Sequence, residues 1–171
     1  MPTDEALVAQ VATGDESALR ELMRRWERPL AHVLHRHTGG RDVEDLYQEV
    51  WLRVVRAADR FDSGRRFSTW LFQIAINRCR DWHRRRPPEP SPGVEMAAPA
   101  DPHPDAALDV AGLLARLPEA QREVVVLRYF QDLSEAEMAD VLEIPRGTVK
   151  SRLHHAMARL NELARGAGGR R

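Results

Sequence analysis

Four polar side chains recur at helical spacing in the most basic stretch of the sequence: Gln73, Asn77, Arg80 and Arg84. At offsets of four, seven and eleven residues they share one face of a helix. Amide groups and guanidinium forks bind base edges and phosphates. Residues 60–86 hold eight arginines and two aspartates, a local charge of +6 in a chain of net charge zero. The face is therefore a candidate nucleic-acid contact, although a merely solvated amphipathic helix has the same composition.

The helix that positions these side chains is predicted to run from about Ser68 to Arg86. Its other side is apolar and built for burial, and it comprises Leu71, Ile74, Ala75, Cys79 and Trp82. Asp62-Ser63-Gly64 predicts a turn just before it, and Arg65 and Arg66 follow at the end of that loop. Aromatic residues beside a basic groove suit unstacked, single-stranded bases. The aromatic candidates here are Phe67, Trp70, Phe72 and Trp82.

Composition restricts the class of protein. The 171 residues allow one or two small domains. No apolar run in the sequence approaches the length of roughly 18 residues that a membrane span needs. The acidic N-terminal segment lacks the apolar core of a signal peptide. The single cysteine, Cys79, is expected to be a buried structural thiol. These features favour a cytoplasmic protein.

Two helical segments are predicted before the basic helix. Residues 4–11 and 15–38 have helical periodicity, with Asp15 as the cap of the second, Pro29 expected to kink or break it, and Gly39-Gly40 ending it. The strongest pattern follows at 42–58, where the outward residues include Asp45, Gln48, Glu49 and Arg53. This outward face is either solvated or a docking surface, and periodicity does not choose between the two.

A change of composition after Arg86 predicts two domains. Residues 87–104 hold seven of the eleven prolines, and residues 87–112 hold five acidic residues and no basic one. Such a segment is typical of an extended, semi-rigid linker. We therefore predict an all-α protein with helical domains at 1–86 and 109–171, joined by a Pro-rich acidic linker at 87–108.

The second domain has the pattern of a helix-turn-helix. Ser134 and Glu137 have capping-box spacing, and the tight connection 143–145 separates a short helix from a second one at about 146–164. The exposed face of that second helix is polar and basic, and it carries Arg146, Thr148, Lys150, Ser151, Arg152, His154 and His155. Such a helix enters the major groove of DNA, whereas an ordinary helical hairpin would turn this face to water.

With both halves considered, the sequence resembles the extracytoplasmic-function group of bacterial sigma factors. The matching segments of the first half are DVEDLYQE (42–49), RFD (60–62), FSTWL (67–71), IAINR (74–78) and DWHRRR (81–86). Those of the second half are LPEAQREV (117–124), LRYF (127–130), LS (133–134), EMA (137–139) and IPRGTVKSRL (144–153). The resemblance covers nearly the whole chain apart from the linker and the C-terminal tail.

The resemblance implies a function in transcription initiation. Asp45, Gln48, Glu49 and Arg53 would dock on the clamp helices of the β′ subunit of core RNA polymerase, and the second domain on the flap of the β subunit. The −10 promoter element would be melted and read by Arg65, Arg66, Trp70, Gln73, Asn77, Arg80 and Arg84. The helix-turn-helix would read the −35 element as a duplex, and the linker would thread the polymerase. Regulation is expected from an anti-sigma factor.

One position departs from the family pattern. The turn of the helix-turn-helix often has glycine where this chain has Glu143, because that position tends to need a positive φ. A glutamate there costs about 1 kcal/mol of strain or shifts the turn.

Other functional classes are less well supported. His32, His35 and His37 lie near one helix end, but no cysteine or acid completes a tetrahedral metal set, so solvated or capping histidines are expected. The sequence offers no phosphate loop, nucleophile motif or supported carboxylate pair, which argues against an enzyme and implies no cofactor. The alternative to a sigma factor is a stand-alone helix-turn-helix regulator. A helical nucleic-acid enzyme is the third hypothesis.

Overall fold

The computed structural model describes residues 1–86 and 104–168, and within these ranges the chain is entirely helical. The N-terminal half contains four α-helices and one short 3-10 helix. Their bounds are α1 Asp4–Ala12, α2 Glu16–Thr38, α3 Val43–Ala57, η1 Ala58–Arg60 and α4 Phe67–Arg85. The C-terminal half contains α5 Pro104–Ala115, α6 Glu119–Tyr129, α7 Glu135–Leu142 and α8 Arg146–Gly168. The all-helical prediction is confirmed for the described residues.

The N-terminal helices enclose one apolar core. α4 contacts both α2 and α3, and α1 contacts α2. Leu22, Val33, Val50 and Leu71 have no exposed surface, so each helix contributes its apolar stripe to the same interior. This packing fixes which side of α4 faces away from the core.

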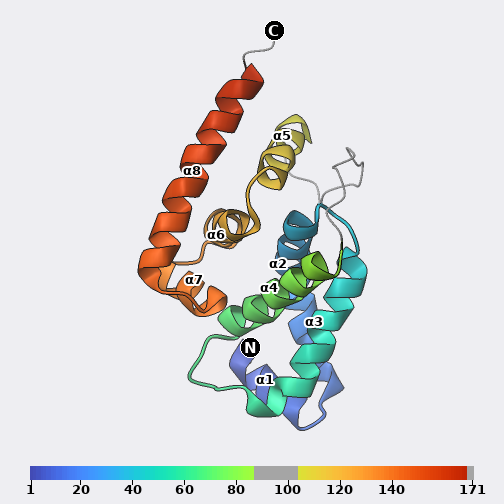
Figure 1. The fold of residues 1–171 in the computed structure, drawn as a ribbon. Coiled ribbons are helices and arrows are strands. Elements are labelled where there is room, and N and C mark those ends of the chain that lie inside the picture. Colours follow the sequence, from blue (N-terminus) through green and yellow to red (C-terminus); the bar gives the residue numbers. More distant parts are fainter. Residues whose placement is uncertain (87–103, 169–171) are drawn as a thin grey trace.

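The two halves lie against each other (Figure 1). α4 contacts α7, and α2 contacts α6 and α5. In Figure 1 the green α4 lies between the blue and cyan helices of the first half and the orange α7 of the second. α8 extends along the outer side of the second half.

The caps expected at several helix ends are present. The Asp15 carboxylate accepts hydrogen bonds from the backbone N–H groups of Ser17 and Ala18 at the start of α2. Gly39 ends α2 with φ of 65°, which suits a residue without a Cβ. Ser134 and Glu137 form a complete capping box at α7.

Two predicted boundaries need correction. Pro29 lies inside α2 and does not break it. Leu22 and Leu30, fully buried on either side, anchor the helix to the core and offset the cost of roughly 3 kcal/mol for an internal proline. In the second half α5 begins at Pro104, five residues before the predicted start at Asp109, because proline is compatible with a first helical turn. Linker residues 87–103 lie outside the described residues.

Candidate nucleic-acid interface

The loop before α4 forms the predicted turn. The Asp62 carboxylate accepts a hydrogen bond from Gly64 N at 2.9 Å, and Arg65 N donates to the Asp62 carbonyl at 2.9 Å. The first turn of α4 is capped from a distance, because Glu5 of α1 accepts from Phe67 N at 2.9 Å. That hydrogen bond is the main reason why the pKa of Glu5 is lowered. Glu5 was not among the predicted site residues, since nothing local links it to α4.

The polar face of α4 brings together most of the residues predicted to read the −10 element. Arg65 Nη2 donates to Gln73 Oε1 at 3.2 Å, and one turn further Arg80 Nη1 donates to Asn77 Oδ1 at 3.4 Å. The face is therefore an ordered row of amides and guanidinium groups. Arg84 is exposed and forms an ion pair with Asp81 near the C-terminal end of the helix.

The proposed aromatic platform is largely wrong. Phe67, Phe72 and Trp82 are buried: Phe67 and Phe72 contact the ring of Trp26, and the Trp82 indole N–H donates to Asp42. The burial of Trp82 was expected, because helical spacing placed it on the apolar side of α4. Phe67 and Phe72 were not placed on that side, and their burial follows from the contacts of α4 with α2 and α3. Trp70 remains partly exposed and is tilted against Phe61, with ring centroids 4.9 Å apart.

Two arginines of this region bind carboxylates of the second half. Arg80 forms a two-pronged ion pair with Glu123 of α6, with Nε–Oε1 at 2.7 Å and Nη2–Oε2 at 2.9 Å. Glu123 is almost wholly buried, and the hydrogen bond to it raises the pKa of Arg80. Arg66 pairs with Glu137 at the start of α7. Neither glutamate was predicted to bind α4, and Glu137 was expected only to complete the capping box of α7. The only available signal for Glu123 was its helical spacing from the apolar residues Ala120 and Leu127.

The helix-turn-helix has the predicted geometry. Glu143 adopts φ of 55° and ψ of 44°, so the chain accepts a left-handed residue in the turn without a glycine. Val149 and Ala156 hold α8 to the core. The predicted −35 residues lie along the other side: Arg146, Lys150, Ser151, His154 and His155 are exposed, and Thr148 and Arg152 are half-buried.

The contacts of this face are mostly local. Ser151 Oγ donates to the Thr148 carbonyl at 3.1 Å, and Lys150 Nζ lies 3.7 Å from a carboxylate oxygen of Glu135. These short-range contacts leave the guanidinium and imidazole groups of the face open to a ligand.

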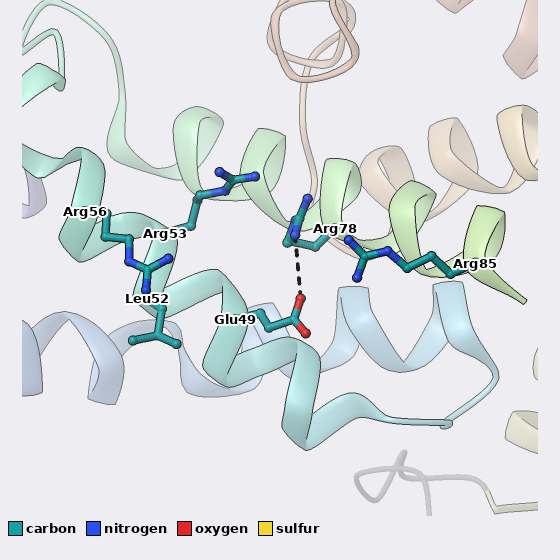
Figure 2. Close-up of a pocket in the computed structure, with 6 residues that line it drawn as sticks. All are labelled: Glu49, Leu52, Arg53, Arg56, Arg78 and Arg85. Carbon is teal, nitrogen blue, oxygen red and sulfur yellow. Dashed lines mark ion pairs between the residues drawn. The ribbon is translucent and has the colours of Figure 1, made fainter.

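The outer face of α3 borders an arginine-lined groove (Figure 2). Asp45, Gln48, Glu49 and Arg53 are exposed, as predicted. Figure 2 shows Glu49 of α3 facing Arg78 of α4 across the groove, with 3.7 Å between the charged atoms. The other lining residues are Leu52, Arg53, Arg56 and Arg85. Burial and the nearby Arg53 cation lower the pKa of Arg78.

The histidines of α2 differ from the prediction. His37 is fully buried rather than solvated, and burial, reinforced by the charge of Arg122, lowers its pKa to about 3. His35 is half-buried, and burial lowers its pKa as well. The burial of Cys79 is confirmed, and it raises the pKa of the thiol to about 12. Within the described ranges, no helix has the length and hydropathy of a membrane span.

Each half of the chain matches a known protein family. Residues 22–87 match the sigma-70 region 2 family, and residues 107–160 match the sigma-70 region 4 family. The ECF RNA polymerase sigma factor SigW of Bacillus subtilis is 30% identical, over 92% of this chain and 95% of its own. The ECF RNA polymerase sigma-E factor of Escherichia coli is 31% identical over 90% of each chain.

Solved structures give the same result. CnrH in complex with the cytosolic domain of CnrY matches with a TM-score of 0.75 and 31% identity, over 95% of this chain and 97% of that one. The sigma factor RpoE of Bartonella quintana, in complex with the anti-sigma factor NepR, matches with a TM-score of 0.74. At 23% identity, over 85% of this chain and 96% of that one, the second likeness concerns the fold alone.

Proposed function

Because the chain belongs to the ECF sigma factors of bacterial RNA polymerase, we propose a division of its surfaces among three ligands. α3 binds the core enzyme, the loop 62–66 and α4 read the melted −10 element, and α8 reads the −35 duplex. We further propose that residues 1–86 and the helices after the linker act as separate units on the promoter. The ordered row of amide and guanidinium groups on α4 carries the proposal.

The α4 face suits an unpaired strand. Asn77 and Gln73 offer both donors and acceptors, as a base edge requires, and Trp70 and Phe61 provide a partly exposed aromatic surface beside them. Taking a base out of its stack costs a few kcal/mol, so the protein must supply compensating contacts. Arg65, Arg66, Arg80 and Arg84 would supply them through backbone phosphates.

The α8 face suits intact duplex. A helix set on a short turn and exposed along its first three turns can enter the major groove with its N-terminal end. Arg146 and Arg152 can form two-pronged contacts with guanine or phosphate, while Lys150, Ser151 and Thr148 position the helix on the backbone. His154 and His155 lie one turn further and extend this contact.

The α3 face suits a protein. Asp45, Gln48, Glu49 and Arg53 are exposed on a helix whose opposite side is buried, and Leu52 and Val55 add exposed apolar surface, at 54% and 43%. Apolar groups inside a charged rim are typical of protein interfaces. We propose the clamp helices of the β′ subunit as the partner of α3, the flap of the β subunit as a partner of the second half, and an anti-sigma factor as the competitor. The likeness to CnrH, solved with the cytosolic domain of CnrY, supports the last of these.

Run-off transcription with core RNA polymerase tests the assignment of α4. On templates selected from a promoter library, Asn77→Ala is expected to reduce open-complex formation at least tenfold, the equivalent of about 1.4 kcal/mol, while binding of core enzyme is unchanged. Equal loss of both would contradict the role of Asn77. Tight binding of duplex promoter DNA by the protein without polymerase would favour a stand-alone regulator instead.

A further inference from the structure

The groove between α3 and α4 carries more positive charge than the carboxylates beside it offset (Figure 2). Four of its lining residues are arginines: Arg53 and Arg56 of α3, and Arg78 and Arg85 of α4. We propose that this groove binds an oligophosphate, a chain of phosphate groups free in solution or carried by a nucleotide, and that this ligand competes with the partner of α3. The binding depends on the groove alone, whereas the competition rests on the proposed function of α3.

Arg78 is the most buried arginine of the groove. Its side chain is 16% exposed, pairs with Asp81 of the same helix and lies 3.7 Å from a carboxylate oxygen of Glu49. Burial and the Arg53 charge lower the pKa of Arg78 in spite of the opposite effect of Glu49. Two carboxylates therefore hold the Arg78 guanidinium in position, but positive charge prevails around it.

Arg53 and Arg85 are not engaged by the protein itself. Both are exposed, and within residues 1–86 and 104–168 neither of them donates a hydrogen bond or pairs with a carboxylate. Figure 2 shows the guanidinium groups of Arg53, Arg78 and Arg85 following one another along α4. Because like charges held close together repel one another, an anion bound among them is stabilised by all three.

A row of guanidinium groups favours a ligand with successive anionic groups. Each guanidinium binds a phosphate or a carboxylate through two parallel N–H donors. A lone carboxylate occupies one such fork, whereas a chain of phosphates presents oxygens to several arginines at once. The groove has a volume of about 290 Å³, near the lower end of the range for small-molecule sites. Leu52, which is 54% exposed, adds apolar surface for an organic part of the ligand.

The position of the groove connects such a ligand with the partner of α3. Glu49 and Arg53 belong to the face proposed to bind core RNA polymerase, and both line the groove. An oligophosphate seated between them occupies part of that face and reverses its local charge. None of the residues proposed to read the −10 element lines the groove, so it is a site separate from the proposed DNA face of α4.

Isothermal titration calorimetry with inorganic tripolyphosphate tests the site in the full-length protein. Arg53→Gln combined with Arg85→Gln removes two exposed cations of the groove. This variant should bind tripolyphosphate about tenfold more weakly than wild type, because charge-assisted contacts are lost. Adenosine triphosphate distinguishes the two sources of the ligand. Tighter binding than that of tripolyphosphate supports a nucleotide, and equal or weaker binding supports an inorganic chain.

A charge-matched control separates a built groove from the attraction of anions to any exposed arginine. Arg20→Gln combined with Arg28→Gln removes the same charge at exposed positions of α2 that do not line the groove. This control should bind tripolyphosphate as wild type does. Equal affinities of the two double variants would overturn the proposal, and so would the absence of saturable binding to wild type at physiological ionic strength.

A single-stranded DNA backbone offers similar anionic groups and is the alternative occupant. The titration is therefore repeated with a random-sequence strand of about 12 nucleotides. If the Arg53 and Arg85 double variant loses more affinity for tripolyphosphate than for the strand, the oligophosphate site is supported. A loss for the strand that equals or exceeds the loss for tripolyphosphate would make the groove a backbone contact and overturn the proposal.

Retention on immobilised core RNA polymerase tests the competition. Tripolyphosphate at roughly ten times its Kd should weaken retention of the wild-type protein about tenfold. Sodium chloride of equal ionic strength is the control for screening. Arg85→Gln, which lies outside the face proposed to bind polymerase, should make retention less sensitive to tripolyphosphate. Equal sensitivity of this variant and wild type would place the effect on the polymerase and overturn the competition.

The oligophosphate site and the proposed function of α3 fail in different ways. Asp45→Arg reverses a charge of the α3 face at an exposed position outside the groove. If α3 does not bind polymerase, this variant is retained like wild type whatever the titration shows. If only the oligophosphate site is wrong, Asp45→Arg is still retained more weakly, while the groove variant binds tripolyphosphate like its control.

Discussion

The two helices proposed to read DNA, α4 and α8, are positioned in different ways. α4 depends on residues far away in sequence: Glu5 caps it, Asp42 binds Trp82, and Glu123 binds Arg80. The start of α7 and the turn to α8 are set mainly by near neighbours, chiefly the Ser134–Glu137 capping box, although Glu137 also pairs with the distant Arg66. The polar face of α4 is consequently enclosed by its surroundings, while that of α8 is open. The face proposed to read the −10 element is thus in contact with other parts of the chain, whereas the face proposed to read duplex DNA is exposed.

The largest expected difference between the helices concerns removal of one arginine from each. Arg80→Ala leaves the Glu123 carboxylate buried without its partner and should lower the free energy of unfolding by about 3 kcal/mol, with separation of the halves limiting the loss. Arg146→Ala removes an exposed side chain and should change the free energy of unfolding by less than about 0.5 kcal/mol. Urea unfolding followed by circular dichroism measures both. Equally small losses would mean that the Arg80–Glu123 pair is not buried in solution.

The histidines provide a second comparison, through pH. His37 stays neutral in the folded protein, with a pKa of about 3 against an ordinary 6.5, and the surrounding Arg80, His83 and Arg122 are basic. The unfolded chain therefore binds the extra proton below pH 6.5, and stability falls as the pH is lowered through that value. Between pH 7.5 and 5.5 His37 should account for about 1.4 kcal/mol of lost stability.

Two substitutions check this dependence on pH. His37→Leu should reduce the pH dependence of the urea midpoint and leave the part that comes from His35, whose pKa is also lowered by burial. His154→Gln, on the exposed face of α8, should leave it as in wild type. A pH dependence that is undiminished in His37→Leu would assign the proton to another group.

The smallest expected effect concerns the helix caps. Glu5→Ala removes the distant cap of α4, and Ser134→Ala the local cap of α7; each should cost about 1 kcal/mol. Hydrogen exchange should distinguish them, with faster exchange in the first turn of α4 for Glu5→Ala and in α7 for Ser134→Ala. If Glu5→Ala leaves exchange at Phe67 unaltered, α4 does not depend on α1 for its start.

The same contrast explains what could be predicted from the sequence. The helices, the capping box and the left-handed Glu143 follow from rules that act within a few residues. The burial of Phe72 and His37 does not, because it depends on which helices meet in the core. The pairing of Arg80 with Glu123 joins residues 43 positions apart, and spacing alone gives no sign of it.

For the α4 and α8 residues named as DNA contacts, exposure and position on a helix face agree with the expectation from sequence, while their binding roles stay predictions. Arg78 and Arg85 of the α3–α4 groove were overlooked because helical spacing places them on the side of α4 that was expected to be buried.

The only thiol of the chain, Cys79, is buried and ionises far above neutral pH. Maleimide dyes and nitroxide spin labels react with exposed thiolates, so the native protein should remain unmodified by them. A cysteine introduced on the surface of either half can then be labelled without first replacing the natural one. The distance between the two halves can therefore be measured spectroscopically, in the free protein and with RNA polymerase, on an otherwise unaltered chain.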